Sequence, residues 1–159
     1  MVNVLKRFRG VGGLPPAMRA RFEPEGILLV AERVAVRQRF SGSVPGRHDA
    51  LSVSRHRGLV VATRSRLYAL VPTMPRLKVP SIDQPWTSVA GSATATLAAE
   101  GLSLHIALGD VDSRFSGDIT TSWRVAVDEA VLAGLPARRL SFDVSSDYVF
   151  SSLGVRVRP

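Results

Sequence analysis

The sequence contains no cysteine, and this absence removes several kinds of chemistry at once. A chain of 159 residues without cysteine has no disulfide, no thiolate nucleophile and no cysteine ligand for zinc or an iron–sulfur cluster. Long apolar runs are also missing. Residues 27–31 form one of the longest, far short of the ~20 residues that span a bilayer. The basic N-terminus lacks the apolar core and cleavage site of a secretory signal. We therefore expect a cytoplasmic protein with no transmembrane segment.

Aromatic and acidic residues are scarce where cations are plentiful. Residues 1–80 carry 15 Lys and Arg against 4 Asp and Glu, whereas residues 81–159 carry 6 against 9. Such asymmetry can mark a surface for phosphates on nucleic acid or anionic lipid. The excess of arginine over lysine, 19 to 2, is equally typical of a GC-rich genome. Aromatics amount to 6%, which argues against a base-stacking platform and hence against nucleic-acid binding.

The length and the 45% hydrophobic content fit one globular domain with a sizeable core. A Gly/Pro-rich stretch separates a basic tail, residues 1–13, from a single domain over residues 14–159. Residues 17–25 have the pattern of one or two helical turns that end near Pro24.

From there the two-residue period of β-strands dominates. Val34, Val36 and Phe40 share one face of a strand over residues 33–40, and arginines occupy the other face. A loop is expected at residues 41–49. The apolar runs 59–62 and 67–71 form either one bent strand or a hairpin that turns at Arg64-Ser65. Further strands are predicted at residues 77–82, 93–99, 102–108, 140–144 and 148–157, with a hairpin turn at Glu100-Gly101.

Residues 118–135 fit two patterns. The alternation of Ile119, Thr121 and Trp123 is that of a strand, while Trp123, Val127 and Val131 also share a helical face before Gly134. We favour a strand that runs into a short helix, and residues 124–134 remain open between the two. Short antiparallel strands with few helical turns predict a mainly-β barrel or bent sheet.

Three segments carry a resemblance to a known family. They are LPPAMRARFEPEGILLVAERV, GLVVATRSRLYAL and KVPSIDQPWTSV. Together they resemble the bacterial pleckstrin-homology-like families, including the GRAM-related ones, over roughly residues 14–110. The matching motifs are a Glu-Arg-Val stretch and a Thr-x-x-Arg-Leu element, and their residues here are Glu32, Arg33, Val34, Thr63, Arg66 and Leu67.

The resemblance implies a strongly bent antiparallel barrel of seven strands, closed by a C-terminal helix. The strands predicted at residues 140–157 depart from that pattern, because they follow the only expected helix in the C-terminal half. They would be extra terminal strands, whose edges could pair with a second subunit. Arg66 is expected to be structural, with its stem against the barrel wall and its head in water.

No constellation of residues predicts catalysis. The sequence has no HExxH, GxSxG or Walker motif, and His48, His56 and His105 lie in unrelated contexts. Asp110, Asp112 and Asp118 are the best carboxylate cluster, but they lack calcium-loop spacing and fit a solvated turn. We predict no enzymatic activity, no cofactor and no metal.

Binding is the better class of function. Two main forms of it stay open, with non-specific nucleic-acid binding as a lesser alternative. The first is protein–protein binding or homo-oligomer assembly, which the resemblance implies. The second is binding of a phosphate or an anionic lipid headgroup at an arginine-rich mouth, because guanidinium groups suit bidentate phosphate contact. The candidate residues for that mouth are Arg37, Arg39, Arg47, Arg55 and Arg57. They converge if residues 33–40 and 48–55 pair as a hairpin.

Overall fold

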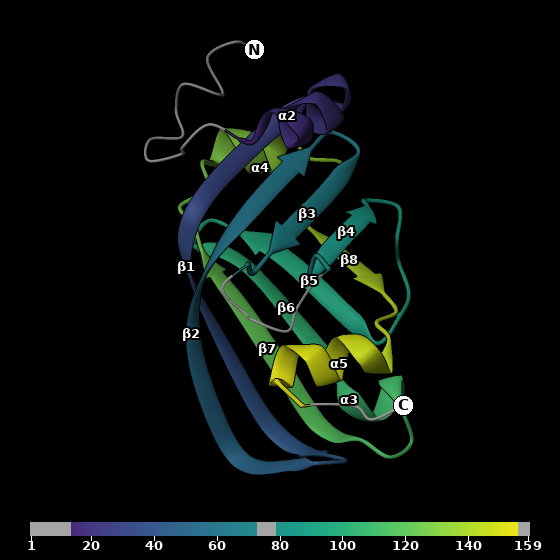
Figure 1. The fold of residues 1–159 in the computed structure, drawn as a ribbon. Coiled ribbons are helices and arrows are strands. Elements are labelled where there is room, and N and C mark those ends of the chain that lie inside the picture. Colours follow the sequence, from purple (N-terminus) through teal and green to yellow (C-terminus); the bar gives the residue numbers. More distant parts are fainter. Residues whose placement is uncertain (1–13, 73–78, 156–159) are drawn as a thin grey trace.

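A computed structural model describes residues 14–72 and 79–155 of the chain (Figure 1). Eight strands form one antiparallel sheet in the order β4-β3-β2-β1-β7-β6-β5-β8. The strands are β1 (Ile27–Val44), β2 (Arg47–Thr63), β3 (Arg66–Leu70), β4 (Ile82–Pro85), β5 (Ala93–Ala98), β6 (Gly101–Ala107), β7 (Ser116–Arg124) and β8 (Arg139–Phe142). The helices are α2 (Pro16–Phe22), the 3-10 turn η1 (Glu23–Glu25), α3 (Leu108–Val111), α4 (Glu129–Gly134) and α5 (Ser146–Leu153).

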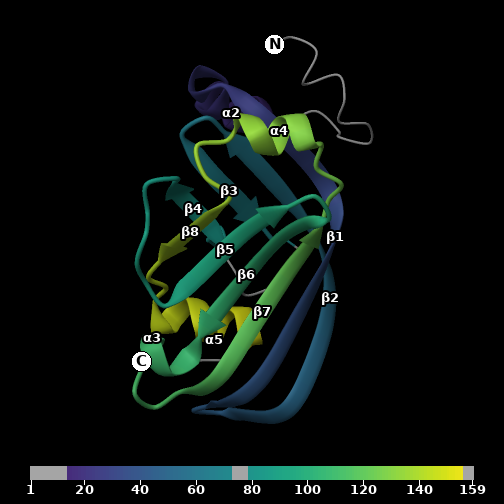
Figure 2. The same ribbon diagram turned by 180° about the vertical axis from the view of Figure 1, so that it is seen from behind.

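The sheet bends until its two ends nearly meet. Val89, just beyond β4, forms a bridge with Ser141 of β8, and the Ser141 N–H donates to the Ser88 carbonyl at 3.1 Å. Helices α2 and α4 lie at one end of this near-barrel, and α3 and α5 at the other (Figures 1 and 2). The predicted mainly-β, bent antiparallel architecture is therefore confirmed.

The long β1–β2 hairpin gives the sheet two chemically different faces. Val36, Gln38 and Phe40 of β1 are buried on the side of the main core, while Arg37 and Arg39 between them are exposed. We call the side of Arg37 and Arg39 the outer face. The turn lies at Pro45-Gly46, so the loop predicted at residues 41–49 is wrong. Cross-strand pairing extends both strands to within two residues of each other and overrides the turn-forming composition.

A bulge near the start of β1 exchanges its two faces. The register with β2 shifts between Ala31 and Val34, and Arg33 there has a φ of 52°. Before the bulge the outer face is apolar, and Val30, Val61 and Tyr68 pack with Phe22 of α2 in a second, smaller core. After the bulge the outer face is open to solvent and cationic.

Other local predictions are also resolved. The chain turns at Arg64-Ser65, so residues 59–71 form a hairpin and not one bent strand. β5 and β6 pair as the predicted hairpin. Residues 118–135 are a strand followed by a helix, β7 and α4. For the strand predicted at 77–82, residues 77–78 lie outside the described part, residues 79–81 are not in a strand, and β4 begins at Ile82. The tail 1–13 lies outside it as well.

The strand predicted at residues 148–157 is wrong, because most of that segment is the helix α5. Ser145 caps the helix by accepting a hydrogen bond from the Tyr148 N–H at 3.1 Å. Gly154 ends it in the left-handed conformation, with a φ of 72°. Tyr148, Val149 and Leu153 reach the main core from one helical face, a spacing that alternation alone conceals. The C-terminal half therefore holds three helices among the described residues, and its last element offers no strand edge.

Candidate functional site: an arginine-lined cleft

The outer face places arginines of β1 and β2 side by side. Arg37 of β1 lies directly opposite Arg55 of β2. Arg57, two residues further along β2, lies opposite Ala35. Directly opposed side chains have Cβ atoms about 4.5–5.5 Å apart, and like charges at that spacing repel each other. The hairpin therefore holds two cations together at a cost in stability that a bound anion would relieve.

These arginines line an open cleft of about 980 Å³ on the outer face of the sheet. Arg37, Arg55 and Arg57 form one side. Arg124 at the end of β7 adds a fourth guanidinium, and one acidic side chain, Glu100, also lines the cleft. The remaining outward-facing polar groups are the hydroxyls of Thr96, Ser103 and Ser122.

The register explains why the hydroxyls lie beside Arg37 on the outer face. β7 pairs Ser122 with Arg37, β6 pairs Ser103 with Ser122, and β5 pairs Thr96 with Ser103. Neighbouring residues on five strands therefore form one row whose side chains all lie on the outer face, namely Arg55, Arg37, Ser122, Ser103 and Thr96. Arg124 and these hydroxyls are absent from the sequence-based site. The two-residue alternation of each strand predicts their face, but it does not reveal which strands are neighbours.

Two of the five predicted arginines lie outside the cleft. Arg39 is exposed on the same face, one row away, opposite Val53 and Thr120. Arg47 points to the other side of the hairpin. Its guanidinium donates to the Leu153 carbonyl and to the Ser52 hydroxyl, each at 2.7 Å, and lies 5.3 Å from the centre of the Phe40 ring. The predicted convergence of Arg47 with the others is therefore wrong, because Arg47 holds the carbonyl end of α5.

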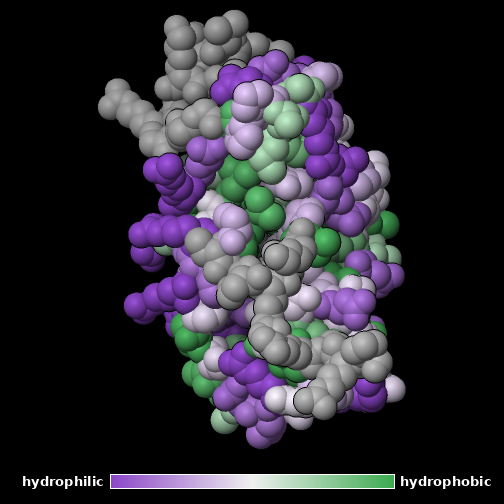
Figure 3. All heavy atoms as spheres, in the orientation of Figure 1, coloured by the Kyte–Doolittle hydropathy of each residue, from purple (hydrophilic) through white to green (hydrophobic). Residues whose placement is uncertain are grey.

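Three of the four cleft arginines lack a carboxylate partner in the described part of the chain: within residues 14–72 and 79–155, no ion pair joins Arg37, Arg55 or Arg124 to a carboxylate. Arg57 contacts the Arg33 carbonyl at 3.4 Å. Hydrophilic side chains project from the side of the molecule that β1 and β2 form (Figure 3). The cleft thus combines positive charge, hydrogen-bond donors and access from solvent.

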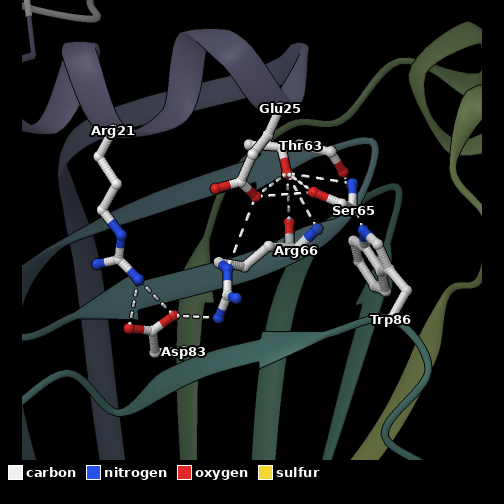
Figure 4. Close-up of polar contacts among 7 residues, drawn as sticks. All are labelled: Arg21, Glu25, Thr63, Ser65, Arg66, Asp83 and Trp86. Carbon is white, nitrogen blue, oxygen red and sulfur yellow. Dashed lines mark hydrogen bonds and ion pairs between the residues drawn. The ribbon is translucent and has the colours of Figure 1, made fainter.

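A second polar cluster lies at the β2–β3 turn and is satisfied internally (Figure 4). The Thr63 hydroxyl oxygen accepts from the N–H groups of Ser65 and Arg66 at 3.2 and 2.9 Å, which fixes the turn. The Arg66 guanidinium lies 2.7 Å from Asp83 and 3.6 Å from Glu25. Arg66 is therefore structural, but its head is paired with two carboxylates and not left in water as expected from the sequence. These ion pairs tie the turn to η1 and β4.

The histidines and aspartates singled out in the sequence do not assemble into one site. His105 contacts Asp118 at 3.1 Å on the outer face. Asp112 accepts hydrogen bonds from Arg114 and from Ser146 of α5, and the Arg114 contacts hold the pKa of Asp112 below its usual range. Burial lowers the pKa of His56. Within the described ranges, no group of three His, Asp or Glu residues could hold a metal ion, and no helix is long and apolar enough to cross a membrane.

Comparison with known proteins assigns no relative to this chain. No protein-family model matches it, and no curated protein and no solved structure matches it significantly. The cleft and its arginines are therefore the basis on which a function is proposed.

Proposed function

We propose that this protein is a non-catalytic binding module whose outer-face cleft holds an anionic group, a phosphate or a carboxylate, of its partner. The observation that carries the proposal is the grouping of Arg37, Arg55, Arg57 and Arg124 around one open cleft of about 980 Å³. The like-charged pair of Arg37 and Arg55 is the strongest element, because its repulsion disappears when an anion binds between the two.

The chemistry of the lining supports an anion over an uncharged ligand. Guanidinium groups donate paired, charge-assisted hydrogen bonds that match both phosphate and carboxylate oxygens. The hydroxyls of Ser103 and Ser122 supply further donors without adding charge. With one carboxylate, Glu100, against four guanidinium groups, the lining is strongly cationic.

The surrounding fold supports a pleckstrin-homology-like module as part of this proposal. A strongly bent antiparallel sheet is nearly closed, and α5 packs against its interior near the C-terminus of the chain. Self-association through a terminal strand loses its support, because that segment is α5. Nucleic-acid binding lacks a stacking surface: all nine aromatic residues in the described part are buried.

Isothermal titration calorimetry with tripolyphosphate as the titrant tests the proposal. We expect Arg37→Ser/Arg55→Ser to weaken binding at least 10-fold, and binding by the unaltered protein to fall with rising salt. The matched control is Arg19→Ser/Arg138→Ser, which removes the same charge from exposed sites outside the cleft and should change affinity less than 2-fold. Equal losses in the two variants would reduce the effect to net charge and overturn the proposal. A parallel binding measurement with phosphatidylserine vesicles distinguishes recognition of a lipid headgroup from recognition of a free phosphate.

A further inference from the structure

In the described part of the chain, one edge of β2 has no neighbouring strand over most of its length. β2 spans Arg47–Thr63 and pairs with β1 along its length, with a register shift at Ala50 and Leu51, but β3 covers only Leu59, Val60, Val61 and Ala62. Among the described residues, no strand pairs with the other edge of residues 47–57. Along this stretch, which we call the open edge, alternate backbone N–H and C=O groups point away from β1.

The outer face of the open edge is patterned. Leu51 and Val53 are apolar side chains exposed at 56% and 41%, and Arg55 and Arg57 follow at the same two-residue spacing. A strand added at this edge would set its own outward side chains opposite these four residues. The edge therefore presents two apolar positions followed by two cationic ones.

The inner face of the open edge has a different character. A hollow of about 190 Å³ lies between it and the C-terminal end of α5, lined mainly by Ser52, Ser54, His56 and α5 residues 151–153. Arg47 also lines this hollow, and its guanidinium donates to the Leu153 carbonyl at the end of α5. Inward side chains of an added strand must therefore be small, because the hollow leaves little room beside α5.

We propose that the open edge accepts an extended acidic segment of a partner protein as an added antiparallel strand. Two of its carboxylates, two residues apart, lie opposite Arg57 and Arg55, and two apolar side chains then lie opposite Val53 and Leu51. Main-chain hydrogen bonds provide the attachment and the alternating side chains provide the specificity. The need for acidic side chains rests on the proposed function of the arginine cleft, whereas the strand addition rests on the open edge alone.

Charge favours a partner over a segment of this chain. Residues 1–13, 73–78 and 156–159, which the structure does not describe, contain seven Lys and Arg and no Asp or Glu. The open edge of a second copy would present Arg55 and Arg57 as well. Neither those segments nor a second open edge supplies acidic residues, and the proposed occupant is therefore a segment of a partner protein.

The test uses a capped fluorescent peptide, Glu-Thr-Glu-Thr-Val-Thr-Val, whose binding is followed by fluorescence anisotropy. Two N-methylated versions are compared, one methylated at the Glu and Val positions and one at the Thr positions. Because alternate N–H groups of a strand face opposite neighbours, one version should lose at least 10-fold in affinity and the other should keep it. Equal loss or equal retention would overturn strand addition.

A charge exchange tests the side-chain contacts. In Arg55→Glu/Arg57→Glu, the affinity for the Glu peptide should fall at least 10-fold. Its affinity for a Lys-Thr-Lys-Thr-Val-Thr-Val peptide should rise at least 10-fold. The control Arg19→Glu/Arg138→Glu changes the net charge by the same amount and should change neither peptide affinity in this way. Circular dichroism checks that all variants are folded.

Failure of this inference differs from failure of the proposed function. Tripolyphosphate binding that depends on Arg37 and Arg55, without binding of the Glu peptide, would overturn the open-edge proposal and leave the cleft proposal intact. Loss of tripolyphosphate binding together with a large difference between the N-methylated peptides would overturn the cleft proposal and leave strand addition standing.

Discussion

Gly58 lies where β2 packs closely against the side chain of Trp123. A Cβ atom at this position would lie 2.7 Å from three atoms, the Leu70 carbonyl oxygen, Trp123 Nε1 and Val36 Cγ2. The Trp123 indole N–H donates to the same Leu70 carbonyl at 3.3 Å. Glycine is therefore required here for close packing and not for an unusual backbone angle.

Gly58→Ala should lower the free energy of unfolding by about 1–3 kcal/mol, because the methyl group must displace backbone or the indole. Urea denaturation measures the change. Gly134→Ala is the matched control, since a Cβ in that α4 position meets nothing within 4 Å and alanine favours helices. The packing explanation is wrong if both variants unfold at the same urea concentration.

Tyr148 links the packing of α5 to pH. Burial raises the pKa of its phenol to about 12 from an ordinary value of 10.0. A group with a raised folded-state pKa contributes its full stability below the unfolded value and loses it as the pH rises through the folded value. The protein should therefore lose roughly 2 kcal/mol through this residue between pH 10 and 12. In Tyr148→Phe, chemical unfolding across that range should show a smaller loss, and an identical loss in both proteins would contradict the assignment.

At the scale of elements, the short helix α2 is anchored by ion pairs as well as by the buried side chain of Phe22. Asp83 of β4 accepts from Arg21 of α2 at 2.7 and 2.9 Å and from Arg66 of β3 at 2.7 Å. One carboxylate thus connects three elements, while the Arg21 guanidinium lies over the rings of Phe22 and Tyr68. A shared, bidentate carboxylate stabilises more than an isolated surface pair does.

Asp83→Asn should destabilise the protein by about 1 kcal/mol at low ionic strength, with a smaller effect in high salt. Glu23→Gln is the control, because it removes the same charge from an exposed pair with Arg19 at 3.8 Å. We expect its unfolding midpoint to stay within error of the unaltered protein. A larger effect of Glu23→Gln than of Asp83→Asn would exclude the anchoring role of Asp83.

At the scale of the whole molecule, one main core unites the sheet, α4 and α5, and the open edge lies at its margin. In the part of the chain that the structure describes, strands β5, β6 and β7 have neighbours on both sides, whereas residues 47–57 have a neighbouring strand on one side. Stability should therefore differ between the centre and the margin of the sheet.

Amide hydrogen exchange measures this difference by NMR. We expect the slowest exchange in β6 and the facing part of β7. Along residues 52–57, where the pairing with β1 is regular, fast and slow amides should alternate, because only every second N–H bonds to β1. Uniformly slow exchange over that stretch would mean that its edge is covered, which would also count against strand addition there.

Local pattern was sufficient for elements that depend on their own residues. The alternation of β1 predicted which side Arg37 and Arg39 occupy, and the β5–β6 hairpin follows from apolar runs around a short polar break. For residues 59–71 the same pattern left a bent strand and a hairpin open, and the structure shows the hairpin. For residues 118–135 it favoured a strand followed by a helix and left residues 124–134 open between the two. Where the pattern was ambiguous, as in the apolar and serine-rich segment that forms α5, alternation suggested a strand, and the helical spacing was missed.

The sequence by itself determined a mainly-β chain with a cationic side to its first long hairpin, because strand periodicity is a local property of successive residues. Only the tertiary structure decided which of those cations share a site. It brought Arg124 and the hydroxyls of β5, β6 and β7 beside Arg37, and it turned Arg47 towards α5. The physical reason is that strand order and register arise from contacts between distant residues, whose optimum depends on how the whole core packs.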